Sequence, residues 1–269
     1  MIGGGKIDMH TELTLGLYAV ALKTILFKEI RRFMRIWVQT VLPPAITTSL
    51  YLLIFGNLIG SRIGTMDGHD YIDYIVPGVI MLSVITNSYS NVVSSFYSTK
   101  FQRHIEEMLV SPIPNWLILS GYVAGGMARG LIVGCVVTAV TMVFTDFTVN
   151  SYVITVTVML LTAALFATGG LINAVFANSF DDISIVPTFV LTPLTYLGGI
   201  FYSISLLPEF WQQASLANPI LYMINAFRFG ILGVSDIDIR LAFAIIIVFV
   251  VALVTAALFL LNRGIGIKN

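Results

Sequence analysis

Residues 241–262 read LAFAIIIVFVVALVTAALFLLN, an uninterrupted uncharged stretch between Arg240 and Arg263. A helix needs about 20 consecutive, mostly apolar residues to cross a hydrocarbon core of about 30 Å, so this stretch predicts a membrane-spanning helix. The composition of the chain agrees with that interpretation. Of its 269 residues, 57% are hydrophobic and only 10% are charged, whereas soluble domains carry about 25% charged residues. The chain is therefore not an ordinary soluble domain.

The spacing of the other charged residues shows where further spans fit. Four more long stretches contain no charge, and the stretch between Glu107 and Asp146 contains only Arg129. None of them alternates between apolar and polar residues, as the strands of a membrane β-barrel do. The sequence therefore predicts an all-α membrane protein with six transmembrane helices, at residues 37–59, 75–96, 116–144, 152–176, 183–202 and 241–261.

The distribution of Lys and Arg predicts the orientation, because cytoplasmic loops carry an excess of these residues. Ten of them fall before the first span, between the second and third spans, or after the last span, whereas the opposite loops hold only Arg62 and Arg240. We therefore expect both termini to be cytoplasmic. The N-terminus lacks the compact basic, apolar and small-residue pattern of a signal peptide, so we expect no cleaved targeting segment.

Several classes of function are excluded by composition and motif. Fourteen Lys and Arg balance fourteen Asp and Glu, which leaves no basic excess for nucleic acid. The single cysteine, Cys135, cannot close an intrachain disulfide or form a cysteine metal cage. The three histidines are too far apart in sequence for a helical metal pair, and no motif of a hydrolase, metalloprotease or ATP-binding loop occurs. We expect no catalytic residue, no metal and no cofactor.

Residues 1–36 form a tail followed by an amphipathic segment. Apolar residues alternate with Lys23, Lys28 and the Arg31-Arg32 pair over residues 13–35. This pattern predicts a helix in the cytoplasmic membrane interface, with its cations toward anionic lipid headgroups. A solvated basic tail is the alternative. The remainder, residues 37–269, is expected to form one six-span domain.

The loop at residues 98–114 is the most informative polar stretch. Phe101, Ile105, Met108 and Leu109 recur at helical spacing, which predicts a short amphipathic helix over about 98–112. Ser98 is placed to cap its start, and two prolines at its end prevent it from continuing into the next span. Such a helix either docks into a groove of a partner protein or lies on the membrane, and the pattern alone leaves both open.

The third expected span carries Gly126, Gly130 and Gly134 at intervals of four residues. Glycines at this spacing let another helix approach closely, so we expect them to serve helix packing. Arg129 lies within the same span, where a charged side chain is costly and must face protein, water or a carbonyl. A structural pairing and a place on a transport path are both open for Arg129.

Residues 203–232 are too apolar for a loop and poorly suited to span. Pro208 and Pro219 bracket the middle of the segment, and Arg228 follows its second apolar part. We expect a re-entrant hairpin from the external side, since a seventh span would reverse the charge bias. In the short turn before the fifth span, Asp181 and Asp182 adjoin, where capping of the next helix and a specific contact are alternatives.

Residues 191–228 resemble the signature of ABC type 2 exporter permeases, which combines spaced apolar and small positions with a Leu-Pro pair, a later Pro-apolar pair and a terminal Arg. The matching positions are Leu191, Leu194, Leu197, Gly198, Ile200, Leu207, Pro208, Pro219, Ile220, Tyr222 and Arg228. Residues 33–37, 105–112 and 180–184 resemble the inner membrane transport permeases within that family.

The resemblance implies a homodimer in the bacterial inner membrane that works with two copies of a separate ABC ATPase subunit, which binds the ATP. The cleft of that subunit would receive the helix at residues 98–112. The expected coupling contacts are Arg103, Glu106, Glu107, Leu109 and Ser111, with Asp181 and Asp182 as a secondary contact. The expected residues of the translocation path or its gate are Arg129, Arg228, Asn87 and Asn91. The exported substrate stays open, and the alternative function is an ion-coupled secondary transporter or a passive channel.

Overall fold

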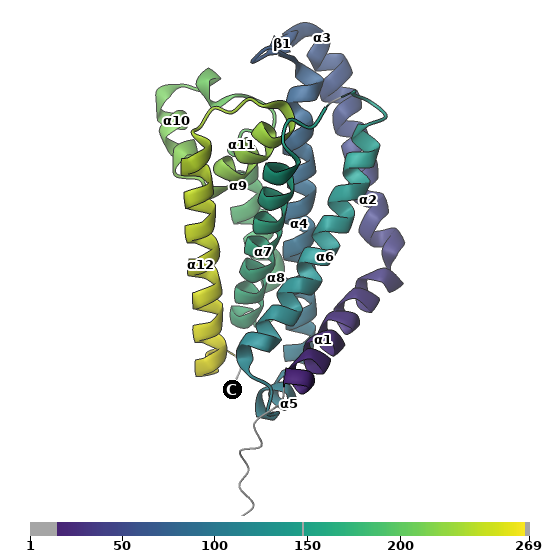
Figure 1. Ribbon diagram of the computed structural model, residues 1–269, viewed down its shortest axis with the longest axis vertical. Helices are drawn as coiled ribbons and strands as arrows, with labels where there is room; N and C mark the ends of the chain where they lie inside the picture. The colour runs from purple at the N-terminus through teal and green to yellow at the C-terminus, as the bar shows by residue number, and fades with distance from the viewer. Residues whose placement is uncertain (1–14, 147, 267–269) are drawn as a thin grey trace, which may run out of the picture.

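The computed structural model describes residues 15–146 and 148–266, and nearly all of the regular structure in this part is helical. Five helical stretches there are long and apolar enough to cross a membrane, which confirms the expected class. They are Trp37–Ile63, α4 (Tyr71–Phe101), α6 (Asn115–Thr141), α7 (Tyr152–Phe176) and α12 (Ile239–Arg263). They form one bundle, with α5 (His104–Val110) at one end and α10 (Glu209–Leu216) at the other (Figure 1). These are called the α5 end and the α10 end below.

The first stretch is a composite of α2 (Trp37–Tyr51), a π-helical segment (Leu52–Ile59) and α3 (Gly60–Ile63). It leads into a small hairpin in which β1 (Thr65–Met66) pairs with β2 (His69–Asp70). The two residues between these strands have positive φ angles, 50° at Asp67 and 84° at Gly68. Asp-Gly is a favoured pair for such a tight hairpin turn, so the local sequence accounts for the reversal of the chain.

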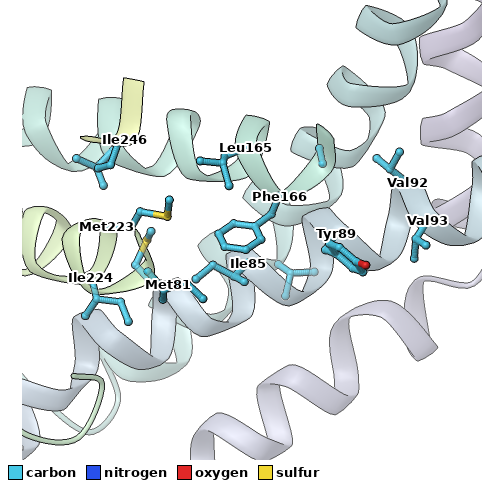
Figure 2. Close-up of a cluster of buried hydrophobic side chains, with 14 of the residues drawn as sticks. Met81, Ile85, Tyr89, Val92, Val93, Leu165, Phe166, Met223, Ile224 and Ile246 are labelled. Carbon is cyan, nitrogen blue, oxygen red and sulfur yellow. The ribbon is translucent and has the colours of Figure 1, made fainter. Parts of the chain in front are cut away.

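The helix α4 is the centre of the bundle. It packs against α6, α7 and α11 (Pro219–Leu232), and most of its side chains are buried. Figure 2 shows Met81, Ile85 and Tyr89 of α4 facing Phe166 of α7 and Met223 of α11. By contrast, α12 leaves many large apolar side chains exposed, as a helix at the lipid-facing edge of a bundle does.

The structure shortens the expected span at residues 183–202, because the helical run there starts at Asp182 and ends at Tyr196. It consists of α8 (Asp182–Val186), a π-helical segment (Pro187–Leu191) and α9 (Thr192–Tyr196). Proline lacks the amide donor of the helical ladder, and two prolines lie in this short stretch, at 187 and 193. At 1.5 Å per residue, residues 182–196 cover about 22 Å, which is short of the full hydrocarbon thickness.

Residues 203–232 fold back at the α10 end, where a short 3-10 turn (Ile204–Leu206) precedes α10 and α11 (Figure 1). The Asn218 side chain accepts a hydrogen bond from the Ile220 amide at 3.0 Å and so caps α11. The same side chain donates to the Leu194 carbonyl of α9. A single asparagine therefore fixes both the start of α11 and its position against α9.

The helix α1 (Leu15–Arg35) precedes the bundle and runs obliquely to it at the α5 end (Figure 1). The chain changes direction at Ile36, whose φ and ψ of −113° and 33° are not helical. An amphipathic helix was expected over residues 13–35, and the part of it from Leu15 onward is helical; residues 1–14 lie outside the described part of the chain.

Candidate coupling site and membrane cleft

The central helix α4 is connected to α5 at the α5 end of the bundle. Arg103 has a φ of 62°, in the left-handed region, and this residue separates α4 from α5. The expected helix over 98–112 therefore begins at His104 instead of Ser98. Ser98 lies inside α4, where its hydroxyl donates to the Ser94 carbonyl at 2.7 Å. The long central helix continues to Phe101 because its packing partners extend that far, a tertiary effect that local spacing does not reveal.

Only one face of α5 is anchored. Ile105 is buried, and the Met108 sulfur lies 4.0 Å from the Tyr122 hydroxyl of α6. Leu109 is half-buried, whereas Glu106 and Glu107 are exposed and Val110 is 87% exposed. Ser111 closes the helix by donating to the Met108 carbonyl at 2.6 Å. The helix thus presents acidic and apolar groups away from the bundle.

The turn between α7 and α8 lies beside the end of α4. The ring of Phe180 packs edge-on against Tyr97 at 4.8 Å and against Phe101 at 5.3 Å, both distances between ring centroids. Lys100 donates to the carbonyls of Val175 and Ala177 at 2.7 Å each. The structure therefore brings the Asp181–Asp182 turn next to the start of the α4–α5 connection.

Within this turn the two aspartates differ. The Asp182 carboxylate accepts hydrogen bonds from the Ser179 hydroxyl at 2.7 Å and from the Asn178 amide at 2.9 Å. These bonds favour the charged form, so they hold the pKa of Asp182 below its usual range. The Asp181 side chain is exposed and makes no capping bond. Asp182 is thus engaged in forming the turn, and Asp181 is presented outward.

The helix α1 is fastened to the bundle by a buried carboxylate. Ile25, Glu29 and Phe33 recur every four residues and are buried, and two of them lie against glycines of α6. A Cβ at Gly121 would lie 2.9 Å from the Cβ of Ile25, and one at Gly125 would lie 2.5 Å from that of Glu29. The glycines therefore allow α1 to pack directly on α6.

Glu29 has no exposed surface, and its carboxylate lies close to three polar side chains. It accepts a hydrogen bond from the Ser95 hydroxyl of α4 at 2.7 Å. Its carboxylate oxygens lie 3.4 Å from the Lys28 Nζ and 3.5 Å from the Arg32 Nε. Because a buried carboxylate is costly unless it is paired and hydrogen-bonded, these contacts explain how Glu29 is accommodated.

Lys28 and Arg32 extend this network into α4 and α6. Lys28 donates to the Tyr122 hydroxyl at 3.1 Å. Burial favours neutral Lys28, but Tyr122 and Glu29 outweigh it and raise the pKa of the ammonium. Arg32 donates to the backbone carbonyl of Asn91 at 2.7 Å and to its side-chain oxygen at 2.8 Å. Asn91, expected on the transport path, is thus fully buried and bound to α1.

The glycine stripe of α6 faces α4. A Cβ at Gly126 would lie 3.0 Å from the Ser88 carbonyl oxygen, and one at Gly130 would lie 3.1 Å from the Val84 carbonyl oxygen. At Gly134 the nearest atom would be a Val84 methyl at 2.7 Å. Arg129 lies between these positions, largely buried, and within the described residues it forms no ion pair with a carboxylate.

A cleft lies over the polar face of α4, between α2 and the helical run formed by α8, the π-helical segment and α9. It comprises two adjoining cavities of about 300 and 180 Å³ that share Tyr51, Leu82 and Thr86 as lining residues. Asn87 lines the larger cavity, and its side chain donates to the Ser83 carbonyl at 3.0 Å. No Asp, Glu, Lys or Arg lines either cavity in the part of the chain that the structure describes.

Arg228 of α11 is completely buried at the other end of the bundle. Its guanidinium carbon lies 4.0 Å from the centroid of the Tyr74 ring of α4. It donates to the carbonyl of Gly199 at 2.5 Å, in a turn where Gly199 has a φ of 74°. Arg228 therefore joins α4, α11 and the turn after α9, and it is not among the residues that line the cleft.

Comparison with known proteins identifies the family. Residues 20–232 match the family model described as ABC-2 type transporter. The chain belongs to this family. The permease is 58% identical over 253 residues to the inner membrane transport permease YadH of Escherichia coli (strain K12), across 94% of this chain and 99% of that protein. It is 24% identical over 217 residues to nodulation protein J of Rhizobium leguminosarum bv. viciae, across 80% of this chain and 83% of that protein.

Family membership fixes the role of the chain. It is the membrane component of an ABC-2 type transporter, it binds no cofactor itself, and the ATPase activity lies in a separate subunit. This confirms the expected resemblance and sets aside the ion-coupled carrier and the passive channel. Within the described residues, no group of three or more His, Cys, Asp or Glu is placed to hold a metal.

Glu29 of the permease was not among the expected site residues. It is the one carboxylate among the basic residues of α1, and it lies four residues from both Ile25 and Phe33. That spacing places it on the apolar face of the helix. A lone acidic residue on the apolar face of a basic amphipathic helix is therefore the signal that identifies this buried contact.

Proposed function

We propose that this permease forms the translocation path of an ATP-driven exporter, as a homodimer with two copies of an ABC ATPase subunit. The permease lies in the inner membrane, as its relative YadH does. Both termini and α5 face the cytoplasm in this proposal, in keeping with the excess of Lys and Arg near the α5 end. In this proposal the helical run α8–α9 and the residues that follow it, up to 202, together make a sixth crossing, and α10–α11 form a re-entrant hairpin.

The observation that carries the proposal is the position of α5. It is a short helix that connects the two long apolar helices α4 and α6. Ile105 is buried against the bundle, whereas Glu106, Glu107 and Val110 are exposed. An exposed apolar and acidic edge at a bundle end fits a groove on a partner protein. Arg103, Leu109 and Ser111 complete the proposed coupling contact. The exposed Asp181, beside the Asp182 turn, supplies the secondary one.

The cleft over α4 is the proposed path. Its walls, α2 and α8–α9, leave large apolar side chains exposed on the outside of the bundle, among them Ile46, Leu50 and Phe189. A second copy packed on these surfaces would enclose the polar residues of the cleft, including Asn87. ATP binds more tightly to the closed ATPase pair than to the open one, and this difference supplies the free energy that moves the path between its states.

The test is a pull-down of tagged permease from its native membrane in mild detergent, with identification of the bound proteins and an ATPase assay. The variant is Glu106→Arg with Glu107→Arg. The matched control reverses two exposed carboxylates at the opposite end, Asp70→Arg with Glu209→Arg. We expect a stoichiometric ATPase subunit with the unmodified chain and the control, and its loss from the α5 variant.

Two results count against the proposal. If the α5 variant keeps both ATPase association and stimulated hydrolysis, α5 is not the coupling contact. If the unmodified permease purifies without any ATPase, under conditions that preserve other ABC complexes, the assembly proposed here is wrong.

A further inference from the structure

A charged groove lies at the α5 end between α1, the end of α4, and α5. Its volume is about 870 Å³. The wall formed by α1 includes Thr24, Lys28, Arg31 and Arg35, which are spaced by four, three and four residues and therefore share one face of the helix. The opposite wall includes His104 and Glu107 of α5. The groove is distinct from the membrane cleft over α4.

The cations of this groove fall into two groups. Lys28 and Arg32 point toward the bundle and are paired with Glu29. Lys23, Arg31 and Arg35 are exposed, and no carboxylate within the described residues lies within 4.0 Å of them. Five Lys and Arg side chains therefore line the groove against one carboxylate, Glu107. This excess of positive charge favours the binding of an anion in the groove.

Hydroxyl and apolar groups complete the surface. Ser98 and Thr99 of α4 line the floor and offer hydroxyls. Phe27 of α1 also lines the groove and is 62% exposed. Arginine and lysine bind phosphate through charge-assisted hydrogen bonds. An exposed aromatic ring beside them offers an apolar contact to the first methylene groups of an acyl chain. The combination of cations, hydroxyls and an apolar rim is that of a phospholipid site.

We propose that this groove binds the phosphate headgroup of an anionic phospholipid of the cytoplasmic leaflet. The large exposed side chains of α1, such as Val20, Phe27 and Met34, then face the acyl chains while Arg31 and Arg35 hold the phosphate. Such a lipid touches both α1 and α5, so it links the membrane surface to the coupling helix. A free phosphate would meet the cations but would leave the apolar rim uncovered.

The proposal takes its membrane orientation from the proposed function, but it does not require transport. Lipid binding is measured on the permease without any ATPase, so failure of the coupling proposal and failure of this one are distinguishable. The probe is native mass spectrometry of the full chain released from vesicles of equal parts phosphatidylglycerol and phosphatidylcholine. The measured quantity is the ratio of the two lipids retained.

The variant is Lys23→Gln with Arg31→Gln and Arg35→Gln. A matched control removes three exposed cations elsewhere, with Arg62→Gln, Arg240→Gln and Arg263→Gln. Each basic residue near an anionic surface changes binding by about fivefold. We therefore expect the phosphatidylglycerol preference to fall at least about tenfold in the groove variant and to change little in the control.

Three outcomes overturn the proposal. The first is equal lipid preference in the groove variant and the control. The second is displacement by inorganic phosphate or glycerophosphoglycerol as effective as by the intact lipid, which indicates a free-anion site. The third is unchanged lipid preference combined with loss of ATPase association, which indicates a protein-docking surface. The melting temperature in phosphatidylcholine vesicles checks the fold, and Arg31→Gln against Arg62→Gln replaces the triple variants if they do not fold.

Discussion

Replacing Glu29 by glutamine tests the buried attachment of α1. Gln keeps the shape of the side chain and an oxygen that accepts the Ser95 hydroxyl bond, which is 2.7 Å long in the structure. It removes the negative charge that lies 3.4 Å from the Lys28 Nζ and 3.5 Å from the Arg32 Nε. The substitution therefore isolates the charge of Glu29 from its packing.

The expected size of the effect follows from burial. Removing one partner of a fully buried ion pair costs about 3–5 kcal/mol, but the side chains of Lys28 and Arg32 are 47% and 32% exposed. Exposed pairs contribute only about 0.2–1 kcal/mol each, whereas a hydrogen bond to a charged group contributes about 1.5–3 kcal/mol. We therefore expect Glu29→Gln to lower the free energy of unfolding by about 2–3 kcal/mol.

The assay is thermal unfolding of the purified permease in one detergent. For a chain of this length, 1 kcal/mol corresponds to about 2 °C in the melting temperature, so a decrease of about 4–6 °C is expected. The matched control is Glu107→Gln, an exposed carboxylate on α5, which should change stability by less than about 0.5 kcal/mol. The cycle is completed by Arg32→Gln and by Glu29→Gln with Arg32→Gln. Because Arg32 also binds Asn91, the double variant should lose more stability than Glu29→Gln but less than the sum of the two single losses.

The reasoning is refuted if Glu29→Gln melts with the unmodified protein. It is also refuted if the double variant shows the plain sum of the single losses, because then Glu29 and Arg32 are not energetically coupled.

Three other predictions concern packing, the buried arginine and pH. Gly130→Ala places a methyl group against the Ser88 hydroxyl and 3.1 Å from the Val84 carbonyl oxygen and should cost about 1–3 kcal/mol, whereas Gly169→Ala, with open space around it, should be neutral or stabilising by thermal unfolding. Because Arg228 is completely buried and joins α4, α11 and the turn after α9, Arg228→Leu should lower the free energy of unfolding by about 1–3 kcal/mol; an unchanged melting temperature together with impaired transport in vesicles would instead indicate a role on the path. Because the pKa of Asp182 is lowered in the folded chain, its stabilising contribution is present above the ordinary carboxyl pKa of about 3.9 and is lost as the pH falls through the lower folded value. Asp182→Asn should remove this part of the pH dependence of the melting temperature, which lies below about pH 5.

Charge spacing predicts where the long helical spans lie. The stretch between Arg240 and Arg263 corresponds to α12, and three other uncharged stretches contain the span Trp37–Ile63, α4 and α7, while α6 lies in the stretch that is interrupted only by Arg129. Hydropathy carries this information because lipid imposes the same length on every spanning helix. It does not report where a helix ends inside an uncharged stretch, so it predicts a helix over residues 183–202 although the helical run ends at Tyr196.

Sites that depend on tertiary contacts are less accessible from sequence. The pattern that starts at Phe101 predicts an amphipathic helix, but the left-handed backbone at Arg103 assigns Phe101 to α4 and the rest to α5. Asn91 is a polar residue within an expected span, as path-lining residues are. In the structure, however, Arg32 of α1 donates a hydrogen bond to it in the protein interior. Both outcomes depend on which helices meet, and a single sequence does not encode that in local spacing.

The unbroken length of α4 has a mechanical consequence. Its 31 residues extend about 46 Å at 1.5 Å per residue, from the β-hairpin at one end to the turn before α5 at the other. A rod of that length acts as a lever: a tilt of about 10° at one end displaces the other by about 8 Å. A force that the proposed ATPase partner applies at the α5 end would therefore reach the opposite end of the bundle through the tilt of this one helix.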